Sequence, residues 1–197
     1  LLICTICLGP VISATWALEH GIRREPKMAI WKNETAYDKI IDGMALGYGI
    51  PAPLIKGVIA KESGFNPKAY KAEPHIGDAS RGLMQVLNRT AKDLGFTGHV
   101  DELYTPSVNI LYGTKLLREN LKRTKNNVGI AVAAYNAGWS KVRKGDAPRD
   151  AKGQFVNQPY VDDVKVYTSY FAGQLEEKEV RAYQRSKLFP GGKTLFF

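Results

Sequence analysis

Glu62 is a carboxylate whose position allows acid chemistry. It follows the apolar run 54–60 and directly precedes Ser63. If this run is helical, Glu62 lies one turn beyond Val58 and two turns beyond Leu54, on the stripe that faces the core. Burial there disfavours the charged form, so the pKa should rise toward the range in which a carboxyl group donates a proton near neutral pH. From this segment alone, an ordinary surface Glu on the last turn of a helix stays the alternative interpretation.

Two further segments carry polar groups of the kinds that sugar recognition uses. Gly82 lets the backbone approach a ligand closely, Met84 supplies an adaptable apolar surface, and Gln85 both donates and accepts hydrogen bonds. Tyr135 and Asn136 close an Ala-rich run that is typical of a helix. Taken singly, each segment is equally typical of a packed core or an ordinary helix end.

In this order and at these separations, Glu62-Ser63 and the two segments resemble the soluble lytic transglycosylases, a family of lysozyme-like enzymes that cleave peptidoglycan. The resemblance runs from about residue 50 to about residue 171, and Tyr160 stands where the family has a substrate-cleft tyrosine ahead of its last helix. It implies a mainly α protein, with a lysozyme-like α-helical domain and little or no β-sheet.

The resemblance also implies a mechanism with one acid. Glu62 would protonate the glycosidic oxygen between N-acetylmuramic acid and N-acetylglucosamine, and the substrate's acetamido group would stabilise the oxocarbenium-like centre. Glu62 would then take the proton of the muramyl C6 hydroxyl, closing a 1,6-anhydro ring. The positions that match substrate-binding residues of the family are Ser63, Met84, Gln85, Tyr135, Asn136 and Tyr160. This chemistry needs no metal and no organic cofactor, and His20, His75 and His99 are scattered along the chain.

One stretch departs from the family pattern. Residues 70–78 are longer and more charged than the usual linker, and they bring in Glu73 and Asp78 as possible second carboxylates. A second carboxylate beside the acid would allow the enzyme to activate water. A hydrolytic muramidase on the same fold therefore remains open, as does a non-catalytic module that binds wall polymers or helps to assemble an envelope-spanning machine.

The chain is strongly basic, with a formal charge of +9 and a sequence pI near 9.5. This charge calls for an anionic partner, and wall polymers, lipid headgroups and nucleic acid are all anionic. No helix-turn-helix, zinc or RNA-binding signature directs the charge at bases, so we expect peptidoglycan glycan strands as the partner and no specific nucleic acid. A membrane contact through the N-terminus, and a secretion, conjugation or phage particle assembly, stay open as further partners.

The chain divides into four predicted parts. Residues 1–18 are uncharged and mainly apolar, which indicates a signal or anchor segment, with a buried helix as the alternative. Residues 19–49 are a linker and lead-in helix, residues 50–172 the lysozyme-like transglycosylase domain, and residues 173–197 a charged and then apolar C-terminal tail. We expect an exported protein in the periplasm or cell envelope, with a virion-associated protein as the alternative.

Hydrophobic spacing predicts the helices that position these residues. They cover residues 35–46, 53–63, 88–94, 107–124, 128–136 and 160–175, and the last one can extend to 185. Residues 141–158 are rich in Gly, Pro and charge and are predicted to form a mobile flap. The pair Cys4 and Cys7 has no further ligand nearby and is interpreted as incidental.

Overall fold

The computed structural model describes residues 30–142 and 154–188. This part is mainly helical, with one small sheet, which confirms the predicted fold class. The elements in chain order are α2 (Asp38–Tyr48), α3 (Ala52–Ser63), β1 (Tyr70–Glu73), the 3-10 turn η1 (Pro74–Ile76), β2 (Asp78–Arg81), β3 (Val86–Leu87), α4 (Asn88–Asp93), the 3-10 turn η2 (Val100–Tyr104), α5 (Pro106–Arg123), α6 (Val128–Ala137), α7 (Trp139–Val142), α8 (Gln158–Phe171) and α9 (Glu177–Leu188).

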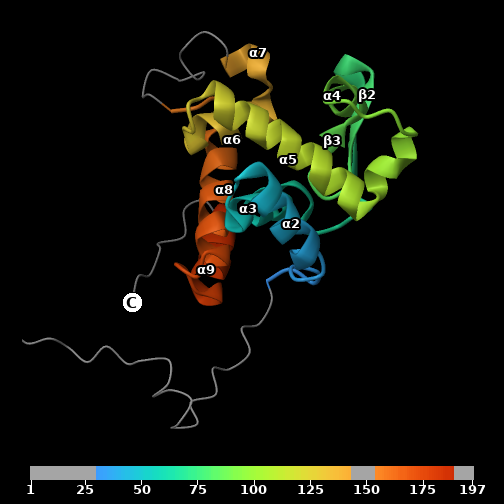
Figure 1. The fold of residues 1–197 in the computed structure, drawn as a ribbon. Helices are drawn as coiled ribbons and strands as arrows, with labels where there is room; N and C mark the ends of the chain where they lie inside the picture. Colours follow the sequence, from blue (N-terminus) through green and yellow to red (C-terminus); the bar gives the residue numbers. More distant parts are fainter. Residues whose placement is uncertain (1–29, 143–153, 189–197) are drawn as a thin grey trace, which may run out of the picture.

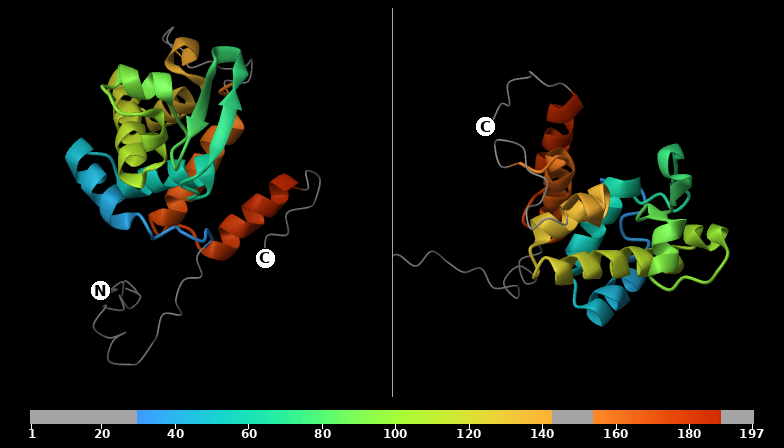
Figure 2. Two further views of the ribbon diagram at one scale, coloured as in Figure 1. Left: turned by 90° about the vertical axis from the view of Figure 1, so that its right-hand side faces the viewer. Right: turned by 90° about the horizontal axis from the view of Figure 1, so that it is seen from above.

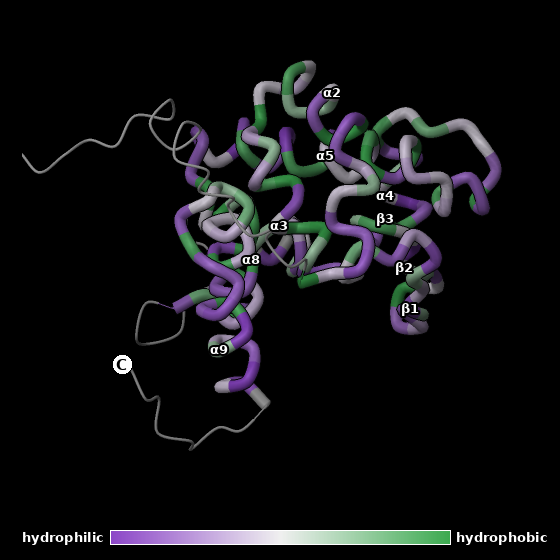
Figure 3. The backbone as a smooth tube through the Cα atoms, turned by 90° about the horizontal axis from the view of Figure 1, so that it is seen from below, coloured by the Kyte–Doolittle hydropathy of each residue, from purple (hydrophilic) through white to green (hydrophobic). Residues whose placement is uncertain are grey.

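Helix α3 is the central element of the fold. Figure 1 shows it between the sheet with α4 on one side and α8 with α9 on the other, and Figure 3 shows apolar segments of α3 between α5 and α8. Prolines suit the first turn of a helix, where their missing N–H would be unpaired in any case, and α3 begins directly after Pro51. Its buried residues are Leu54, Ile55, Gly57, Val58, Ile59 and Ala60. Because α3 packs along α8, the last turn of α3 is fixed beside that helix.

A sharp reversal ends α3 directly after the candidate acid. Gly64 is left-handed (φ 57°), and its N–H donates to the Ala60 carbonyl at 3.2 Å. Phe65 is left-handed as well (φ 64°), which is unusual for a bulky residue, and its ring is fully buried against Trp31 and Phe171. Burial of this ring therefore holds a strained turn at the end of α3.

The charged stretch 70–78 forms most of a β-hairpin, which the sequence pattern did not predict as strands. Strand β1 pairs antiparallel with β2, with Tyr70 opposite Arg81 and Glu73 opposite Asp78, and β2 pairs antiparallel with β3. Figure 2 shows the hairpin as a long green ribbon beside the helices, and α4 packs against β2 and β3. Strand β1 has only four residues, and three of them are exposed, so it has no buried face of the kind that marks a strand in a core.

Most predicted helices agree with the structure. The helices predicted at 53–63, 88–94, 107–124 and 128–136 are displaced by no more than one residue at either end, whereas α2 begins three residues later than predicted. The last predicted helix is two helices, because Gly173 adopts φ 74° between α8 and α9. Helix α9 is mostly polar (Figure 3) but buries Val180 completely.

Several sequence predictions fall outside the described residues. These are the apolar segment 1–18, most of the flap, at 143–153, and most of the apolar tail, at 189–197. The division of the chain into four parts stays a prediction. Among the helices that the structure describes, none combines the length and the apolar character needed to cross a membrane.

Candidate active site

Glu62 and Tyr160 are joined by a short hydrogen bond. The Tyr160 hydroxyl donates to Glu62 Oε1 at 2.6 Å. Glu62 lies on the last turn of α3 and is partly buried, and Tyr160 lies on the first turn of α8 with 7% of its surface exposed. The packing of α3 along α8 brings together these residues, which are 98 positions apart in the chain.

The surroundings of Glu62 shift the pKa of its carboxyl group to near neutral pH. Burial raises the pKa of Glu62 from 4.5 to about 7, although the Tyr160 hydrogen bond and the charges of Lys61 and Lys71 act to lower it. Near neutral pH, both the protonated and the ionised form are therefore populated. Such a group can first donate a proton and then accept one, as an acid/base catalyst must.

A second tyrosine, Tyr135, lies close enough to Glu62 for the charge of the acid to affect its pKa. Burial and the Glu62 charge raise the pKa of the Tyr135 hydroxyl well above its ordinary value, so this tyrosine stays neutral. Its hydroxyl donates to the Met84 carbonyl at 2.9 Å. Tyr135 thus connects α6 to the loop between β2 and β3, on the same side of the fold as the acid.

Ser63 holds that loop against the end of α3, and Gln85 joins the loop to the residue before β1. Ser63 Oγ donates to the Leu83 carbonyl at 2.7 Å. The Gln85 side-chain NH₂ group donates to the carbonyls of Gly82 at 3.0 Å and Ala69 at 3.1 Å. In the part of the chain that the structure describes, no hydrogen bond reaches Gln85 Oε1. That oxygen remains available to a ligand.

Asn109 on α5 is a positioning residue that the sequence did not single out. It is fully buried, and its Oδ1 accepts the Met84 N–H at 2.7 Å. Its Nδ2 donates to the carbonyls of Leu103 at 2.6 Å and Arg81 at 2.8 Å. In the sequence it is one of several polar residues on the buried face of α5, and nothing there reveals its partners.

The expectation that Met84 contacts substrate is wrong for its side chain. The side chain is completely buried and packs so closely on α5 that a Cβ on Gly113 would lie 2.4 Å from its Sδ atom. Met84 contributes through its backbone, because its N–H and carbonyl anchor the loop to Asn109 and Tyr135.

Within the described residues, no hydrogen bond links the Asn136 side chain to Glu62 or Tyr160. It is exposed at the end of α6, and its Oδ1 accepts from Asn157 Nδ2 at 3.1 Å. Asn157 also donates to the Ala133 carbonyl at 3.0 Å. The structure thus uses Asn136 to connect α6 to the start of α8.

The two candidate second carboxylates both have partners on the hairpin, and Asp78 also has one on α4. Asp78 accepts from the N–H groups of Arg89 at 3.0 Å and Ala79 at 2.7 Å and from the Arg81 guanidinium at 3.3 Å. Although burial acts to raise it, these hydrogen bonds hold the pKa of Asp78 below its ordinary value. Glu73 forms an ion pair of 2.7 Å with Lys71. Neither contacts Glu62 within the described chain.

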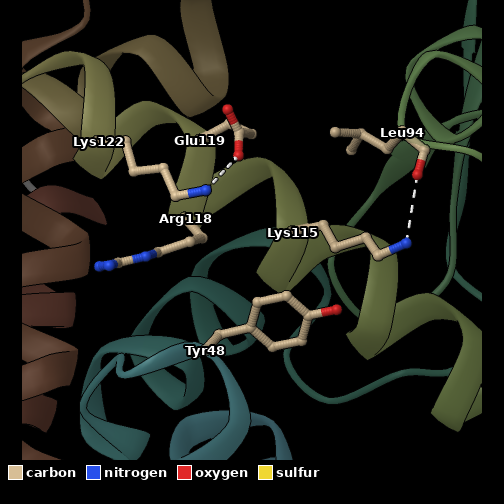
Figure 4. A pocket seen from close by; sticks show the side chains of 6 residues that line it. All are labelled: Tyr48, Leu94, Lys115, Arg118, Glu119 and Lys122. Atoms are coloured by element: carbon tan, nitrogen blue, oxygen red, sulfur yellow. Dashed lines mark hydrogen bonds and ion pairs between the residues drawn. The ribbon is translucent and has the colours of Figure 1, made fainter.

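A separate, basic cavity of about 260 Å³ lies between α2 and α5 (Figure 4). Lys115 donates to the Leu94 carbonyl at 3.2 Å, and Lys122 forms an ion pair of 3.0 Å with Glu119. The residues that line the cavity are Tyr48, Leu94, Lys115, Arg118, Glu119 and Lys122. Its one carboxylate is ion-paired, so the cavity offers positive charge and no acid that is free to act.

No group of three or more His, Cys, Asp or Glu side chains that could hold a metal ion occurs within residues 30–142 and 154–188. The absence of a cofactor stays a prediction. The fold and the site together define a lysozyme-like helical domain in which a partly buried acid accepts a hydrogen bond from one tyrosine and lies near a second.

Comparison with known proteins identifies the family. The family model described as "Transglycosylase SLT domain" matches residues 39–158. The chain therefore belongs to the transglycosylase SLT-domain family, within the lysozyme-like superfamily, and the predicted resemblance is confirmed.

Individual relatives agree with this membership. The chain is 36% identical over 109 residues to the transglycosylase of Enterobacteria phage PRD1, covering 55% of this chain and 37% of that protein. It is 38% identical over 122 residues to the membrane-bound lytic murein transglycosylase C of Actinobacillus pleuropneumoniae, covering 55% of this chain and 32% of that protein. The chain thus spans about a third of the length of these relatives.

The fold is similar to that of the 70 kDa soluble lytic transglycosylase from Escherichia coli. The TM-score is 0.57 at 27% identity, over 73% of this chain and 26% of that one. Tyr160 lies just past the segment that the family model matches.

Proposed function

We propose that this protein is a peptidoglycan lytic transglycosylase with Glu62 as its sole acid/base. The observation that carries the proposal is a partly buried carboxyl group with a pKa of about 7 that accepts a hydrogen bond from Tyr160. Membership of the transglycosylase SLT-domain family supports the reaction class. The murein transglycosylase among its relatives supports peptidoglycan as the substrate.

The proposed reaction consumes no water. Protonated Glu62 gives its proton to the glycosidic oxygen as the bond from this oxygen to muramyl C1 breaks, and the muramyl acetamido oxygen stabilises the positive charge at C1. Ionised Glu62 then takes the proton of the muramyl C6 hydroxyl as its oxygen bonds to C1. The products are a free N-acetylglucosamine hydroxyl and a 1,6-anhydromuramyl end, and Glu62 regains its proton.

The other site residues support this step in different ways. The Tyr160 hydroxyl orients the carboxyl group, and Gln85 Oε1 is proposed to accept a hydrogen bond from the sugar. Ser63 and Tyr135 fix the loop that carries Gln85. Asn136, exposed at the end of α6, is proposed to contact a sugar farther from the acid.

Water activation by a second carboxylate is less compatible with the geometry. Asp78 is ionised and uses both of its oxygens in hydrogen bonds, to Ala79 on the hairpin and to Arg89 on α4, and Glu73 is paired with Lys71. A general base for water must have an oxygen that is free to accept a proton beside the sugar. We therefore favour the non-hydrolytic route.

Mass spectrometry of digested peptidoglycan tests this proposal. We expect muropeptides that lack the elements of one water relative to a muramidase digest of the same wall. Products of hydrolytic mass would overturn the proposed reaction in favour of a muramidase. An intact glycan after prolonged digestion would favour a non-catalytic, wall-binding module.

Tyr160→Phe is expected to move the pH dependence of the reaction upward. The Tyr160 hydrogen bond stabilises ionised Glu62, so its loss should raise the pKa of Glu62 further above 7. The acid would then keep its proton to higher pH, and the decline of activity on the alkaline side should move up by roughly one pH unit. Initial rates on purified sacculi across the pH range measure this shift.

Tyr135→Phe is the matched control. Its hydroxyl bonds the Met84 carbonyl and not Glu62, so we expect a lower rate without an upward shift. An equal shift in both variants would show that the Tyr160 hydrogen bond does not set the protonation of Glu62.

The basic charge and the cell-envelope setting fit together in this proposal. Both the wall and the membrane surface are anionic, and a formal charge of +9 favours retention there at low ionic strength. We propose that the protein acts at the cell envelope. The phage relative keeps a virion-associated role open as the alternative setting.

A further inference from the structure

Asp163 on α8 is a buried carboxylate held by two lysines from two different helices. Its surface is 4% exposed, and its Oδ2 lies 2.8 Å from Lys61 Nζ on α3. Its Oδ1 pairs with Lys187 on the last turn of α9. Although burial acts to raise it, the hydrogen bonds from Lys187 and Lys61 hold the pKa of Asp163 below its ordinary value. Burying an ionised carboxylate costs free energy unless it is paired, and both lysines supply a positive charge that compensates for this cost.

Lys61 directly precedes the candidate acid in the chain. Adjacent residues on a helix point about 100° apart, so Lys61 and Glu62 do not face each other by default. The four-carbon stem of a lysine is flexible, however, and can swing across that angle. The ion pair with Asp163 places Lys61 Nζ 5.9 Å from the centre of the Tyr160 ring, the same ring whose hydroxyl bonds Glu62.

An ammonium group released next to Glu62 would favour its ionised form, which is the wrong form for the first proton transfer. The charged and titratable groups that act on Glu62 come from four elements, and they are Lys61 on α3, Lys71 on β1, Tyr135 on α6 and Tyr160 on α8. Both tyrosines are neutral, and each lysine is paired with a carboxylate, Lys61 with Asp163 and Lys71 with Glu73.

The two pairs differ in their surroundings. The Lys71 side chain is 70% exposed, so water screens its pair with Glu73. The Lys61 side chain is 34% exposed and its partner Asp163 only 6%. The ion pair of Lys61 with Asp163 is therefore screened less by water than the ion pair of Lys71 with Glu73.

We propose that Asp163 is a positioning residue for Glu62: by holding Lys61 in an ion pair on α8, it keeps this ammonium group off the acid and lets Glu62 retain its proton near neutral pH. This role rests on the proposed function of Glu62. Lys187 shares the same carboxylate and attaches α9, which lies beyond the segment that the family model matches, to α8.

The test is an NMR titration of the Glu62 carboxyl carbon in the full chain without substrate, with the signal assigned by its loss in Glu62→Gln. Asp163→Asn should lower the pKa of Glu62 by roughly half a unit to one unit, and Lys61→Met should raise it. In the double variant Lys61→Met/Asp163→Asn, the effect of the Asn substitution should disappear. An unchanged titration in Asp163→Asn, or an equal fall in the Lys61→Met background, would overturn the proposal, because Asp163 would then not act through Lys61.

Two controls separate this role from general stability. Lys187→Met removes the contact of α9 and leaves the Lys61 pair in place, so it should lower the melting temperature with little change in the titration of Glu62. A shift as large as that of Asp163→Asn would assign the effect to α9 packing and overturn the proposal. Glu73→Gln should shift the titration less than Asp163→Asn, because the exposed Lys71 is screened.

The outcome is independent of whether the proposed reaction is correct. A wild-type protein that leaves purified sacculi intact would contradict the proposed function, whereas the titration would still report on Asp163. An active enzyme with an unchanged titration in Asp163→Asn would contradict only the role of Asp163. If Asp163→Asn does not fold, Lys61→Met decides alone, and the absence of a rise in the pKa of Glu62 would overturn the proposal.

Discussion

Glu62→Gln is expected to reduce glycan cleavage by at least about a hundredfold, which is the range of general acid–base catalysis. Glutamine has nearly the same shape, and its oxygen can still accept the hydrogen bond from Tyr160, but it has no proton to give to the glycosidic oxygen. The measurement is the release of soluble muropeptides from purified sacculi, with binding to the same sacculi as a check that the surface is intact. Near-normal activity in this variant would show that Glu62 is not the acid.

The same variant should be more stable than the wild type at alkaline pH. The folded state raises the pKa of Glu62 from 4.5 to about 7, so it favours the protonated form. The stability contributed by this proton is fully present below pH 4.5 and is lost as the pH rises through 7. Above that range the ionised group costs up to about 3 kcal/mol, a cost that Gln does not have.

Urea unfolding at several pH values measures this effect. The two proteins should have similar free energies of unfolding near pH 4, where Glu62 is protonated in both states, and they should diverge as the pH rises. A difference that does not depend on pH would show that the fold does not perturb this carboxyl group. Loss of activity combined with a gain in alkaline stability distinguishes a removed acid from a damaged fold.

Glu73→Gln is the matched control on the hairpin, because it makes the same chemical change at a carboxylate that is paired with Lys71. We expect it to keep most of the activity and to show no stability gain at alkaline pH. A loss as large as that of Glu62→Gln would support a second catalytic carboxylate and the hydrolytic route.

The sequence predicted those parts of the site that depend on local spacing. The position of Glu62 on the core-facing stripe of α3 follows from helical periodicity, and the structure places it on the last turn of that helix. The relation of Tyr160 to the acid came from the family resemblance, since no local pattern relates residues 98 positions apart. Asn109 was missed for the same reason, because its three partners lie on other elements.

The orientation of the loop residues could not be predicted from residue types. Both Met84 and Gln85 were expected to line the cleft, but the chain turns through positive φ at Gly82 (72°) and at Gln85 (48°). This turn directs the Met84 side chain into the core, where it meets Gly113. Which of two adjacent residues points outward depends on backbone angles that the tertiary contacts of the loop select.

Those contacts make Gly82 a sensitive backbone position near the acid, and Gly82→Ala is expected to destabilise the fold by several kcal/mol. A Cβ at this position would lie 2.4 Å from Asn109 Nδ2 and 2.6 Å from the Leu103 carbonyl oxygen. To make room, Asn109 must move, and its buried hydrogen bonds to Met84, Leu103 and Arg81 would be weakened or lost. Each buried polar group left without a partner costs about 1–3 kcal/mol.

Gly77→Ala provides the matched control for this prediction. Gly77 has a similar φ of 64°, against 72° at Gly82, but a Cβ added at Gly77 would meet nothing within 4 Å among the described residues. Both variants therefore incur the left-handed strain of about 1–2 kcal/mol, and only Gly82→Ala adds the collision with Asn109.

The comparison isolates what the loop contributes to the site. Gly82→Ala should lower both the free energy of unfolding, measured with urea, and the rate of muropeptide release at a temperature where it remains folded. The rate should fall because Ser63, Gln85 and Tyr135 all bond to the displaced loop. Gly77→Ala, at the tip of the hairpin, should leave the rate nearly unchanged. If the two variants lose equal stability and equal activity, the packing of Asn109 under the loop does not hold the acid's surroundings in place, and the strain of the left-handed backbone alone accounts for the loss.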